Sequence, residues 1–350
     1  MHKLLKKKPF IIAEISANHN GSLKLAKKLI LSAKKNGADA VKIQSYIPSS
    51  MTINSKKKDF IIKKGIWKNQ KLWDLYEKAQ TPFEWHNELF KYSRSRNINL
   101  FSTPFDTEAV DILEKLRCPF YKIASFEMTH LPLLKKIAGT NKTIIMSTGM
   151  ANLDEIKFSY NYLKKNGAKD IIILYCVSNY PSKDEDFNMN NIKILKSTFG
   201  CKIGFSDHSN NIEIAKCALA AGAEIFEKHF ALEKQKKGFD IEFSTKGADL
   251  KIYKKQLEYF DLLLGKDHFF RTKKEINNKV FRRSIYAVRE IPKGTKFSKK
   301  NIKIIRPGYG ISPLNYFNLI NNGKSNVLIK KETALKFSMI KINKNIKLMK

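Results

Sequence analysis

Short apolar runs recur along the first 265 residues, each followed by a polar cluster and then by a stretch with helical periodicity. The runs are rich in β-branched residues and do not alternate with polar positions, which is typical of strands buried on both faces. They comprise Phe10–Ile15, Ala40–Gln44, Asn99–Ser102, Phe120–Ile123, Thr143–Ser147, Ile171–Tyr175, Lys202–Phe205 and Ile225–Lys228. The pattern therefore predicts eight short parallel strands.

The segments between these runs carry apolar residues at helical spacing. One helix is expected over Ser22–Asn36, where five apolar residues share one face: Leu23, Ala26, Leu29, Ile30 and Ala33. Asn36 and Gly37 then supply a helix stop. Strand and helix alternating eight times predict a (β/α)8 TIM barrel. A doubly wound sheet is the alternative, but no GxGxxG sequence follows the first strand.

The repeating pattern ends near Gly265. Lys266–Val280 is charged and weakly apolar, and we interpret it as a linker. Short strands and turns follow from Phe281: Ser284–Val288, Ile302–Ile305 and Val327–Ile329. We therefore expect a barrel over residues 1–265, a linker over 266–280 and a small β-rich domain over 281–350, near the lower size limit for independent folding.

The connection after the second predicted strand, Ser45–Gln80, is too long for a plain βα loop. It carries three consecutive lysines and Trp67. Long ordered loops at the catalytic face of a barrel usually form lids or contacts between subunits.

Composition fits an ordinary globular protein, with 43% hydrophobic residues. No apolar stretch approaches the ~20 residues that a membrane span needs, and Glu14 interrupts the apolar run after the basic N-terminus, which argues against a signal peptide. The four cysteines have no CxxC spacing, and we read them as reduced thiols of a cytoplasmic protein: Cys118, Cys176, Cys201 and Cys217.

The formal net charge of +34 raises the question of a nucleic-acid partner. The excess is nearly all lysine, spread along the chain together with abundant Ile and Asn. All three residues have A/T-rich codons, so genomic base composition explains the excess equally well. Since no nucleic-acid-binding motif accompanies the charge, we expect a solvated basic surface that helps to attract anionic substrates, and no nucleic-acid partner.

Two histidines follow the last two predicted strands at the same point. His208 closes a Ser-Asp-His sequence and His229 closes Glu-Lys-His, 21 positions further along. In a barrel, imidazoles at the carboxyl ends of neighbouring strands point into one cavity. Each histidine is beside a carboxylate that can orient its ring, so we interpret the pair as functional rather than as two core histidines.

Two lysines interrupt the apolar strands. Lys42 and Lys122 each lie between apolar neighbours, and a buried ammonium is costly unless an anion pairs with it. Together with the hydroxyls at the strand ends, they predict a cradle for a phosphate and a carboxylate. An internal ion pair, such as Lys122 with Glu127, and a Schiff-base lysine are the alternatives.

The histidine pair favours a metal ion over a Schiff base as the group that activates a carbonyl. Two imidazoles with open positions suit Mn²⁺, Mg²⁺ or a similar ion such as Co²⁺, whereas a closed structural zinc site needs four protein ligands. The pair alone does not identify the ion.

At these positions the chain resembles the sialic acid synthase family over nearly its whole length. The matching segments are Ala13–Gly21, Lys42–Gln44, Phe101–Phe105, Tyr121–Ser125, Ser147–Met150, Tyr180–Pro181, Gly204–Ser209 and Glu227–Phe230. The C-terminal segment is similar to the antifreeze-like (SAF) domain of that family, through Phe281, Ser284 and Arg306–Gly308.

The resemblance implies metal-dependent condensation of phosphoenolpyruvate with an amino-sugar aldehyde, giving a nine-carbon keto acid and phosphate. His208 and His229 match the metal ligands. The positions that match phosphoenolpyruvate contacts are Lys42, Lys122, Ser125, Ser147 and Ser206. The positions that match the sugar site are Gln44, Glu127, Tyr180 and Asp240. Glu14 and Glu127 are candidates for proton transfer, and the role of His19 stays open.

The resemblance also implies a domain-swapped homodimer, because Arg306 matches an arginine that the small domain inserts into the partner's barrel. Val177 and Ser178 depart from the pattern of the neuraminate branch, which puts phosphate contacts there in doubt.

The insertion indicates the branch of the family. Ser55–Gly65, Leu75–Glu77 and Thr81–His86 are most similar to the branch that forms pseudaminic acid from 2,4-diacetamido-2,4,6-trideoxy-L-altrose. Neuraminate or legionaminate synthesis is the nearest alternative. A basic nucleic-acid-binding protein on an inactive barrel is the alternative of a different class.

Overall fold

The computed structural model describes residues 5, 7–63, 67–178, 184–266, 268–342 and 348–349. The chain divides into two compact units, Met1–Gly265 and Lys266–Lys350. Each unit has its own core of buried apolar side chains.

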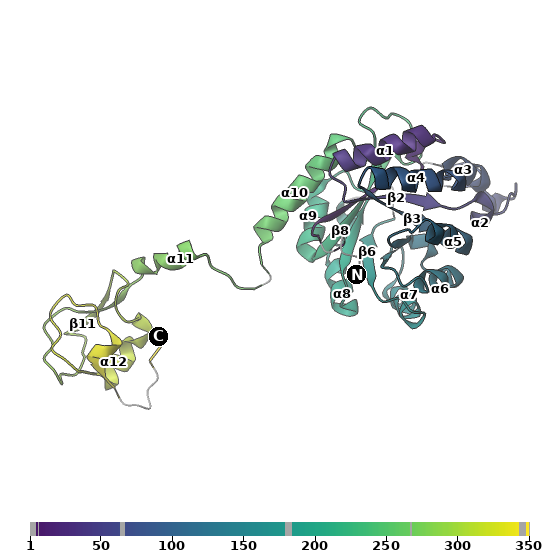
Figure 1. The fold of residues 1–350 in the computed structure, drawn as a ribbon. Helices are drawn as coiled ribbons and strands as arrows, with labels where there is room; N and C mark the ends of the chain where they lie inside the picture. Colours follow the sequence, from purple (N-terminus) through teal and green to yellow (C-terminus); the bar gives the residue numbers. More distant parts are fainter. Residues whose placement is uncertain are drawn as a thin grey trace. The chain divides into compact units, whose positions relative to one another are not determined.

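The first unit is a closed barrel of eight parallel strands (Figure 1). Each strand pairs with the next, and β1 pairs with β8, so that the sheet has no free edge. The strands are β1 (Phe10–Glu14), β2 (Ala40–Ser45), β3 (Asn99–Pro104), β4 (Tyr121–Ile123), β5 (Ile144–Ser147), β6 (Ile171–Cys176), β7 (Ile203–Asp207) and β8 (Ala223–Ala231). The short strand β9 (Thr245–Lys246) adds to β8. The predicted (β/α)8 fold is confirmed.

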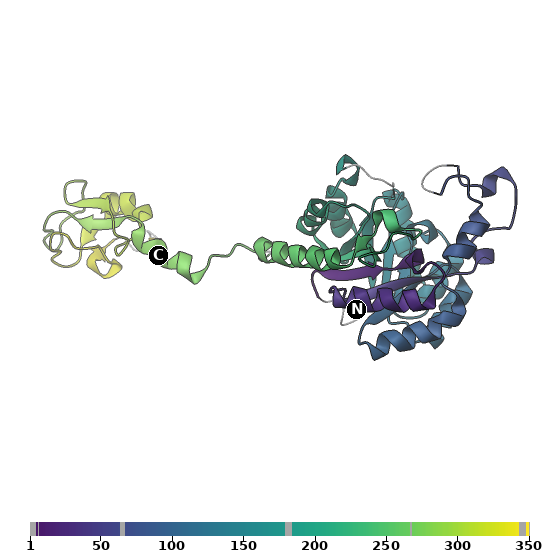
Figure 2. The same ribbon diagram turned by 90° about the horizontal axis from the view of Figure 1, so that it is seen from above.

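Helices surround the strands in both views (Figures 1 and 2). They are α1 (Leu23–Lys35), α4 (Phe83–Ser95), α5 (Thr107–Lys115), α6 (Leu131–Ala138), α7 (Leu153–Lys165), α8 (Asn190–Phe199), α9 (Ile212–Ala221) and α10 (Ala248–Leu264). Helix α1 follows the predicted pattern: Ser22 caps its N-terminus, and its buried residues are Ala26, Leu29, Ile30 and Ala33. In the described part of the chain, none of the helices is long and apolar enough to cross a membrane.

The strand register brings ionisable residues together at the carboxyl ends of the strands. Glu14 of β1 lies opposite Lys42 of β2 on one side and His229 of β8 on the other. Ser206 of β7 lies opposite Glu227 of β8. Because side chains alternate between the two faces of a strand, Glu227 and His229 share the face that points into the barrel.

The insertion after β2 is ordered where it is described. It contains α2 (Pro48–Met51), a 3-10 turn (Lys58–Phe60) and α3 (Leu72–Ala79), and Figure 1 shows both helices beyond the end of β2. Tyr46 packs edge-on against Tyr76 of α3 and Phe105. These aromatic contacts fix the insertion to the carboxyl ends of β2 and β3.

The second unit contains two small antiparallel sheets. In one, β10 (Ser284–Ala287) pairs with β11 (Ile302–Ile305), and in the other, β12 (Lys324–Ser325) pairs with β13 (Ile340–Lys341). Two features differ from the sequence-based expectation. Helix α11 (Lys273–Asn277) lies within the expected linker. Among the described residues, the expected strand at Val327–Ile329 contributes a single bridge, from Ile329 to Ile291.

Candidate active site

A buried cluster of two lysines and two glutamates occupies the carboxyl end of the barrel interior. Lys42 Nζ lies 2.5 Å from Glu14 Oε2 and 3.2 Å from Glu227 Oε1. Lys122 Nζ lies 3.5 Å from the same Glu227 oxygen. All four side chains are at most 5% exposed. Glu227 therefore connects the two lysines.

The protonation of this cluster favours an anionic ligand. Burial would raise the pKa of Glu227, but Lys122 and Lys42 outweigh burial and lower that pKa to about 2. Burial raises the pKa of Glu14 to about 7, against the opposing effect of Lys42. Burial also lowers the pKa of Lys122, with Glu227 opposing it. A bound anion would stabilise the charged form of Lys122.

Three serines that were predicted to bind the anion lie at or just after the carboxyl ends of β4, β5 and β7. The backbone N–H of Gly149 donates to Ser125 Oγ at 3.0 Å, and Ser206 Oγ donates to Glu227 Oε1 at 3.3 Å. Among the described residues, Ser147 Oγ is buried without a hydrogen-bond partner. A Cβ at position 149 would collide with the Ser178 hydroxyl. Glycine there lets these side chains pack closely against the backbone.

The two histidine rings meet next to this cluster. The centroids of His208 and His229 lie 5.4 Å apart, and both rings contact Phe243 edge-on. Burial lowers the pKa of His208 to about 4 and lowers that of His229 well below its ordinary value. Both imidazoles are therefore neutral at physiological pH, which is the form that binds metal ions.

The donor set fits a divalent cation. His208 Nδ1 lies 3.3 Å from the Val177 carbonyl oxygen, so a proton on Nδ1 leaves Nε2 as the donor atom. His229 Nδ1 is buried without a hydrogen-bond partner among the described residues, and Asp240 Oδ2 lies 3.6 Å from it. No group of three or more His, Cys, Asp or Glu metal ligands occurs in the described part of the chain. Two imidazoles leave other coordination positions to oxygen ligands.

We expected the adjacent carboxylates to orient the rings, and the structure corrects this. Val177 and Asp240 contact the ring nitrogens, whereas Asp207 Oδ2 accepts a hydrogen bond from Tyr253 on the outer side of the barrel. The alternation of side chains along β7 sends Asp207 outwards. Similarly, the ion-pair partner of Lys122 is Glu227 and not Glu127.

The remaining predicted residues inside the first unit lie near the strand ends. Asp240 is buried, and burial raises the pKa of its carboxyl group, with Ser16 and Ala17 opposing the shift. Gln44 is half-buried at the end of β2. Glu127 follows β4, and its Oε2 is buried without a hydrogen-bond partner among the described residues.

Three other positions have different outcomes. Tyr180 lies outside the described residues. Arg306 is an exposed residue of the second unit, and its predicted contact with a barrel stays a prediction. His19 is fully buried: its Nε2 lies 3.2 Å from Thr81 Oγ1, and its Nδ1 accepts from the Gly21 N–H. These contacts give His19 a structural role.

Two residues to which the sequence assigned no binding or catalytic role contribute to the site. Glu227 lies at the centre of the ion cluster, and its spacing of two from His229 is the signal that could have identified it. Asn18 anchors the loop that carries Asp240, because its amide donates to the Phe230 carbonyl and to Ser244 and its oxygen accepts from the Asp240 N–H.

The (β/α)8 fold, with buried lysines, carboxylates and neutral imidazoles at its strand ends, defines an enzyme of the TIM-barrel class. The chain belongs to the NeuB family, whose model matches residues 29–268, and a SAF domain model matches residues 282–341. The sequence-based resemblance is thereby confirmed.

Individual relatives agree over most of the chain. It is 42% identical to a pseudaminic acid synthase of Campylobacter jejuni, over 94% of this chain and 96% of the relative. It is 40% identical to an N,N'-diacetyllegionaminic acid synthase of the same species, over 89% and 94%. The crystal structure of an N-acetylneuraminic acid synthetase from Leptospira borgpetersenii matches with a TM-score of 0.70 at 32% identity, over 78% of this chain and 90% of that one.

The carboxyl of Glu127 provides a first prediction, on the pH dependence of stability. Burial raises its pKa to about 7. Between about pH 4.5 and 7 the folded protein keeps a proton that the unfolded chain loses, so this group makes stability fall as pH rises. Between pH 5 and pH 8, we expect the free energy of unfolding of the wild type to fall by about 2–3 kcal/mol relative to that of Glu127→Gln.

Urea unfolding of both proteins at several pH values measures this difference. Glu108→Gln, a change at an exposed site on α5, is the control and should follow the wild type. A constant difference between wild type and Glu127→Gln across this range would contradict the raised pKa.

Proposed function

We propose that this chain is a pseudaminic acid synthase that condenses phosphoenolpyruvate with 2,4-diacetamido-2,4,6-trideoxy-L-altrose. The observation that carries the proposal is the 42% identity to a pseudaminic acid synthase over 94% of the chain. The geometry supports it, because lysines suited to an anion lie beside a neutral histidine pair suited to a cation.

His208 and His229 would hold a divalent cation such as Mn²⁺, Mg²⁺ or Co²⁺, which supplies Lewis acidity to the aldehyde carbonyl of the sugar. Lys42 and Lys122, with Ser125, Ser147 and Ser206, bind the phosphate and carboxylate of phosphoenolpyruvate. Gln44, Tyr180 and Asp240 orient the open-chain sugar.

The reaction forms one carbon–carbon bond and breaks one carbon–oxygen bond. C3 of phosphoenolpyruvate attacks the aldehyde carbon, and the carbonyl oxygen takes a proton to become a hydroxyl. Water adds to the electron-poor C2 and loses a proton, and the tetrahedral intermediate expels phosphate by C–O cleavage. Glu127 and Glu14, both with a pKa of about 7, exchange these protons, and the lysines stabilise the departing phosphate.

An assay of phosphate release tests the proposal. The purified chain is incubated with phosphoenolpyruvate and Mn²⁺, and with either the altrose-configured sugar, the legionaminic acid precursor or N-acetylmannosamine. We expect metal-dependent release that is fastest with the altrose-configured sugar. Preference for either other sugar defeats the pseudaminate assignment in favour of the matching branch, which the 40% identity to a legionaminic acid synthase keeps open. No release with any sugar, together with tight, salt-sensitive RNA binding, favours the nucleic-acid alternative.

We also propose a domain-swapped homodimer in the cytoplasm, without a membrane or nucleic-acid partner. Exposed apolar side chains near the end of α10 support association between copies: Tyr259, Leu262, Leu263 and Leu264. The four free cysteines support a reducing compartment. Light scattering during gel filtration measures the mass, and a monomer at micromolar concentration would contradict the dimer.

A second prediction concerns Arg306. If this residue completes the partner's sugar site, Arg306→Ala raises the KM for the sugar at least about 10-fold and leaves the KM for phosphoenolpyruvate and the melting temperature unchanged. Arg289→Ala, a change elsewhere in the second unit, is the control. An unchanged sugar KM would remove Arg306 from the site.

A further inference from the structure

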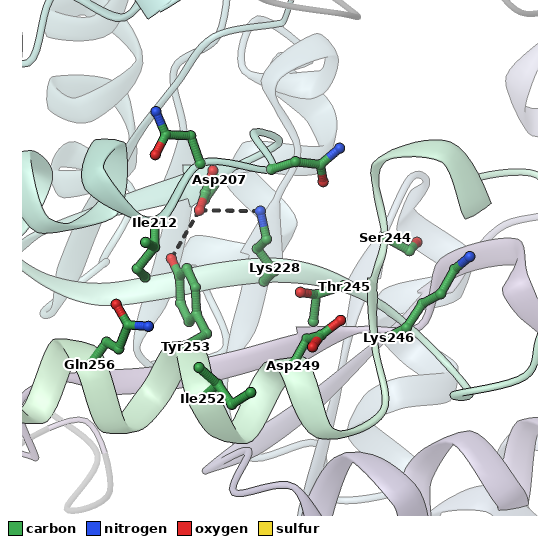
Figure 3. A pocket seen from close by; sticks show the side chains of 12 residues that line it. Asp207, Ile212, Lys228, Ser244, Thr245, Lys246, Asp249, Ile252, Tyr253 and Gln256 are labelled. Atoms are coloured by element: carbon green, nitrogen blue, oxygen red, sulfur yellow. Dashed lines mark hydrogen bonds and ion pairs between the residues drawn. The ribbon is translucent and has the colours of Figure 1, made fainter.

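A second buried ion pair lies on the outer side of β7 and β8, behind the two histidines. Asp207 is 0% exposed and Lys228 is 3% exposed, and Lys228 Nζ lies 3.2 Å from Asp207 Oδ2. The hydroxyl of Tyr253, on α10, donates to the same oxygen at 3.0 Å. Figure 3 shows these three side chains converging at the wall of a polar pocket of about 400 Å³.

Asp207 and Lys228 each directly precede one of the two histidines in the sequence. Asp207 Oδ1 accepts from the backbone N–H of Ser209 at 2.8 Å and from its hydroxyl at 2.7 Å, which closes a turn over His208. Lys228, the residue before His229, donates to the carbonyl oxygen of Ser209. Asp207 and Lys228 therefore connect the turn that contains His208 to strand β8, which contains His229.

An ion pair at this place is unusual on energetic grounds. Outward-facing strand residues of a barrel normally pack against helices with apolar side chains, as Phe226 does. Removing two charges from water costs about as much as their attraction returns, so an apolar pair of similar size would stabilise the fold equally well. The pair is therefore better explained by the orientation that it imposes than by stability.

We infer that Asp207, Lys228 and Tyr253 are positioning residues, which hold His208 and His229 at the separation that a shared divalent cation requires. This inference rests on the proposed function, in which these histidines bind the ion. The three residues act through backbone geometry, since their side chains point away from the barrel interior. Residues that orient metal ligands from behind typically change affinity 10- to 100-fold when replaced.

The most direct test is Tyr253→Phe, which removes one hydroxyl and keeps the ring packed against Phe226, 6.4 Å away between centroids. Titration of the full-length chain with Mn²⁺ alone, followed by the electron paramagnetic resonance of the free ion, measures the Kd without turnover. We expect the Kd to rise about 10-fold in Tyr253→Phe and up to about 100-fold in Asp207→Asn.

Lys254→Met supplies a matched control on the same helix. Lys254 is the next residue of α10, and its Nζ lies 3.0 Å from Asp39 Oδ1. Asp39 directly precedes β2, so this ion pair lies at the opposite end of the barrel from the histidines. This variant loses a partly buried ion pair but should keep the wild-type Kd for Mn²⁺. The double variant Asp207→Leu/Lys228→Met replaces the outer pair with apolar side chains, and it should melt near the wild-type temperature yet bind Mn²⁺ more weakly.

The outcomes separate the inference from the proposed function. A wild-type chain that binds no Mn²⁺ defeats the metal site, and the inference with it. A wild-type chain that binds Mn²⁺, with unchanged Kd in Tyr253→Phe and Asp207→Asn, overturns the positioning role alone. Equal weakening in Lys254→Met also overturns it, because the effect would then follow general stability.

Discussion

Replacing either His208 or His229 with alanine is expected to lower metal-dependent turnover by at least about 10³-fold, because a Lewis acid contributes several kcal/mol to such a reaction. The two rings lie 5.4 Å apart, and burial keeps both neutral. Loss of one ring leaves a single imidazole, which binds divalent ions weakly. Each single variant should therefore lose nearly as much turnover as the variant in which both histidines are replaced.

Phosphate release from phosphoenolpyruvate at saturating Mn²⁺ measures this loss, and thermal melting checks that the barrel is folded. His268→Ala, at an exposed position of the second unit, is the matched control and should keep wild-type activity. Near-normal turnover in either His208→Ala or His229→Ala would remove that residue from the metal site.

The sequence predicted these histidines because the barrel has a strict geometry. Uniformly apolar runs fixed the strands, parallel pairing placed their carboxyl ends at one edge, and a spacing of one βα unit put His208 beside His229. The same reasoning identified Lys42 and Lys122 as inward-facing. In each case, the local pattern and the fold impose the same constraint.

The partners of these residues were not predictable in the same way. Which carboxylate meets Lys122, and what contacts each imidazole, depend on rotamers and on loops far apart in sequence. Asp240, for example, lies 3.6 Å from His229 in a loop that Asn18, which follows β1, holds by a hydrogen bond to the Asp240 N–H. Because Asp207 is adjacent to His208 in sequence, we predicted that it orients the His208 ring. Side chains alternate along β7, however, so the Asp207 carboxylate lies on the other face of the strand.

Replacing Lys42 with methionine is expected to abolish use of phosphoenolpyruvate and to destabilise the barrel by about 3–5 kcal/mol at pH 8. Lys42 is the ion-pair partner of Glu14 and one of two lysines that contact Glu227. Its loss leaves the Glu14 carboxylate buried without its counterion, whereas Glu227 keeps Lys122. The site also loses half of the positive charge that would bind the phosphate.

The stability loss should depend on pH, and this separates it from a simple packing defect. Burial already raises the pKa of Glu14 to about 7, and without Lys42 that pKa rises further, so the carboxyl takes up a proton instead of remaining an unpaired charge. Unfolding by urea should therefore show a smaller loss at pH 5 than at pH 8. An equal loss at both pH values would mean that Lys42 contributes packing rather than charge.

A double variant completes the test. Lys42→Met/Glu14→Gln removes both charges of the pair, and the neutral amide keeps the shape of the carboxyl group. We expect it to recover most of the stability at pH 8 while remaining inactive, because it lacks both the lysine of the anion site and the Glu14 carboxyl that exchanges protons. Recovery of both stability and turnover would assign Lys42 to folding alone, leave phosphate binding to Lys122 and the serine hydroxyls, and remove Glu14 from proton exchange.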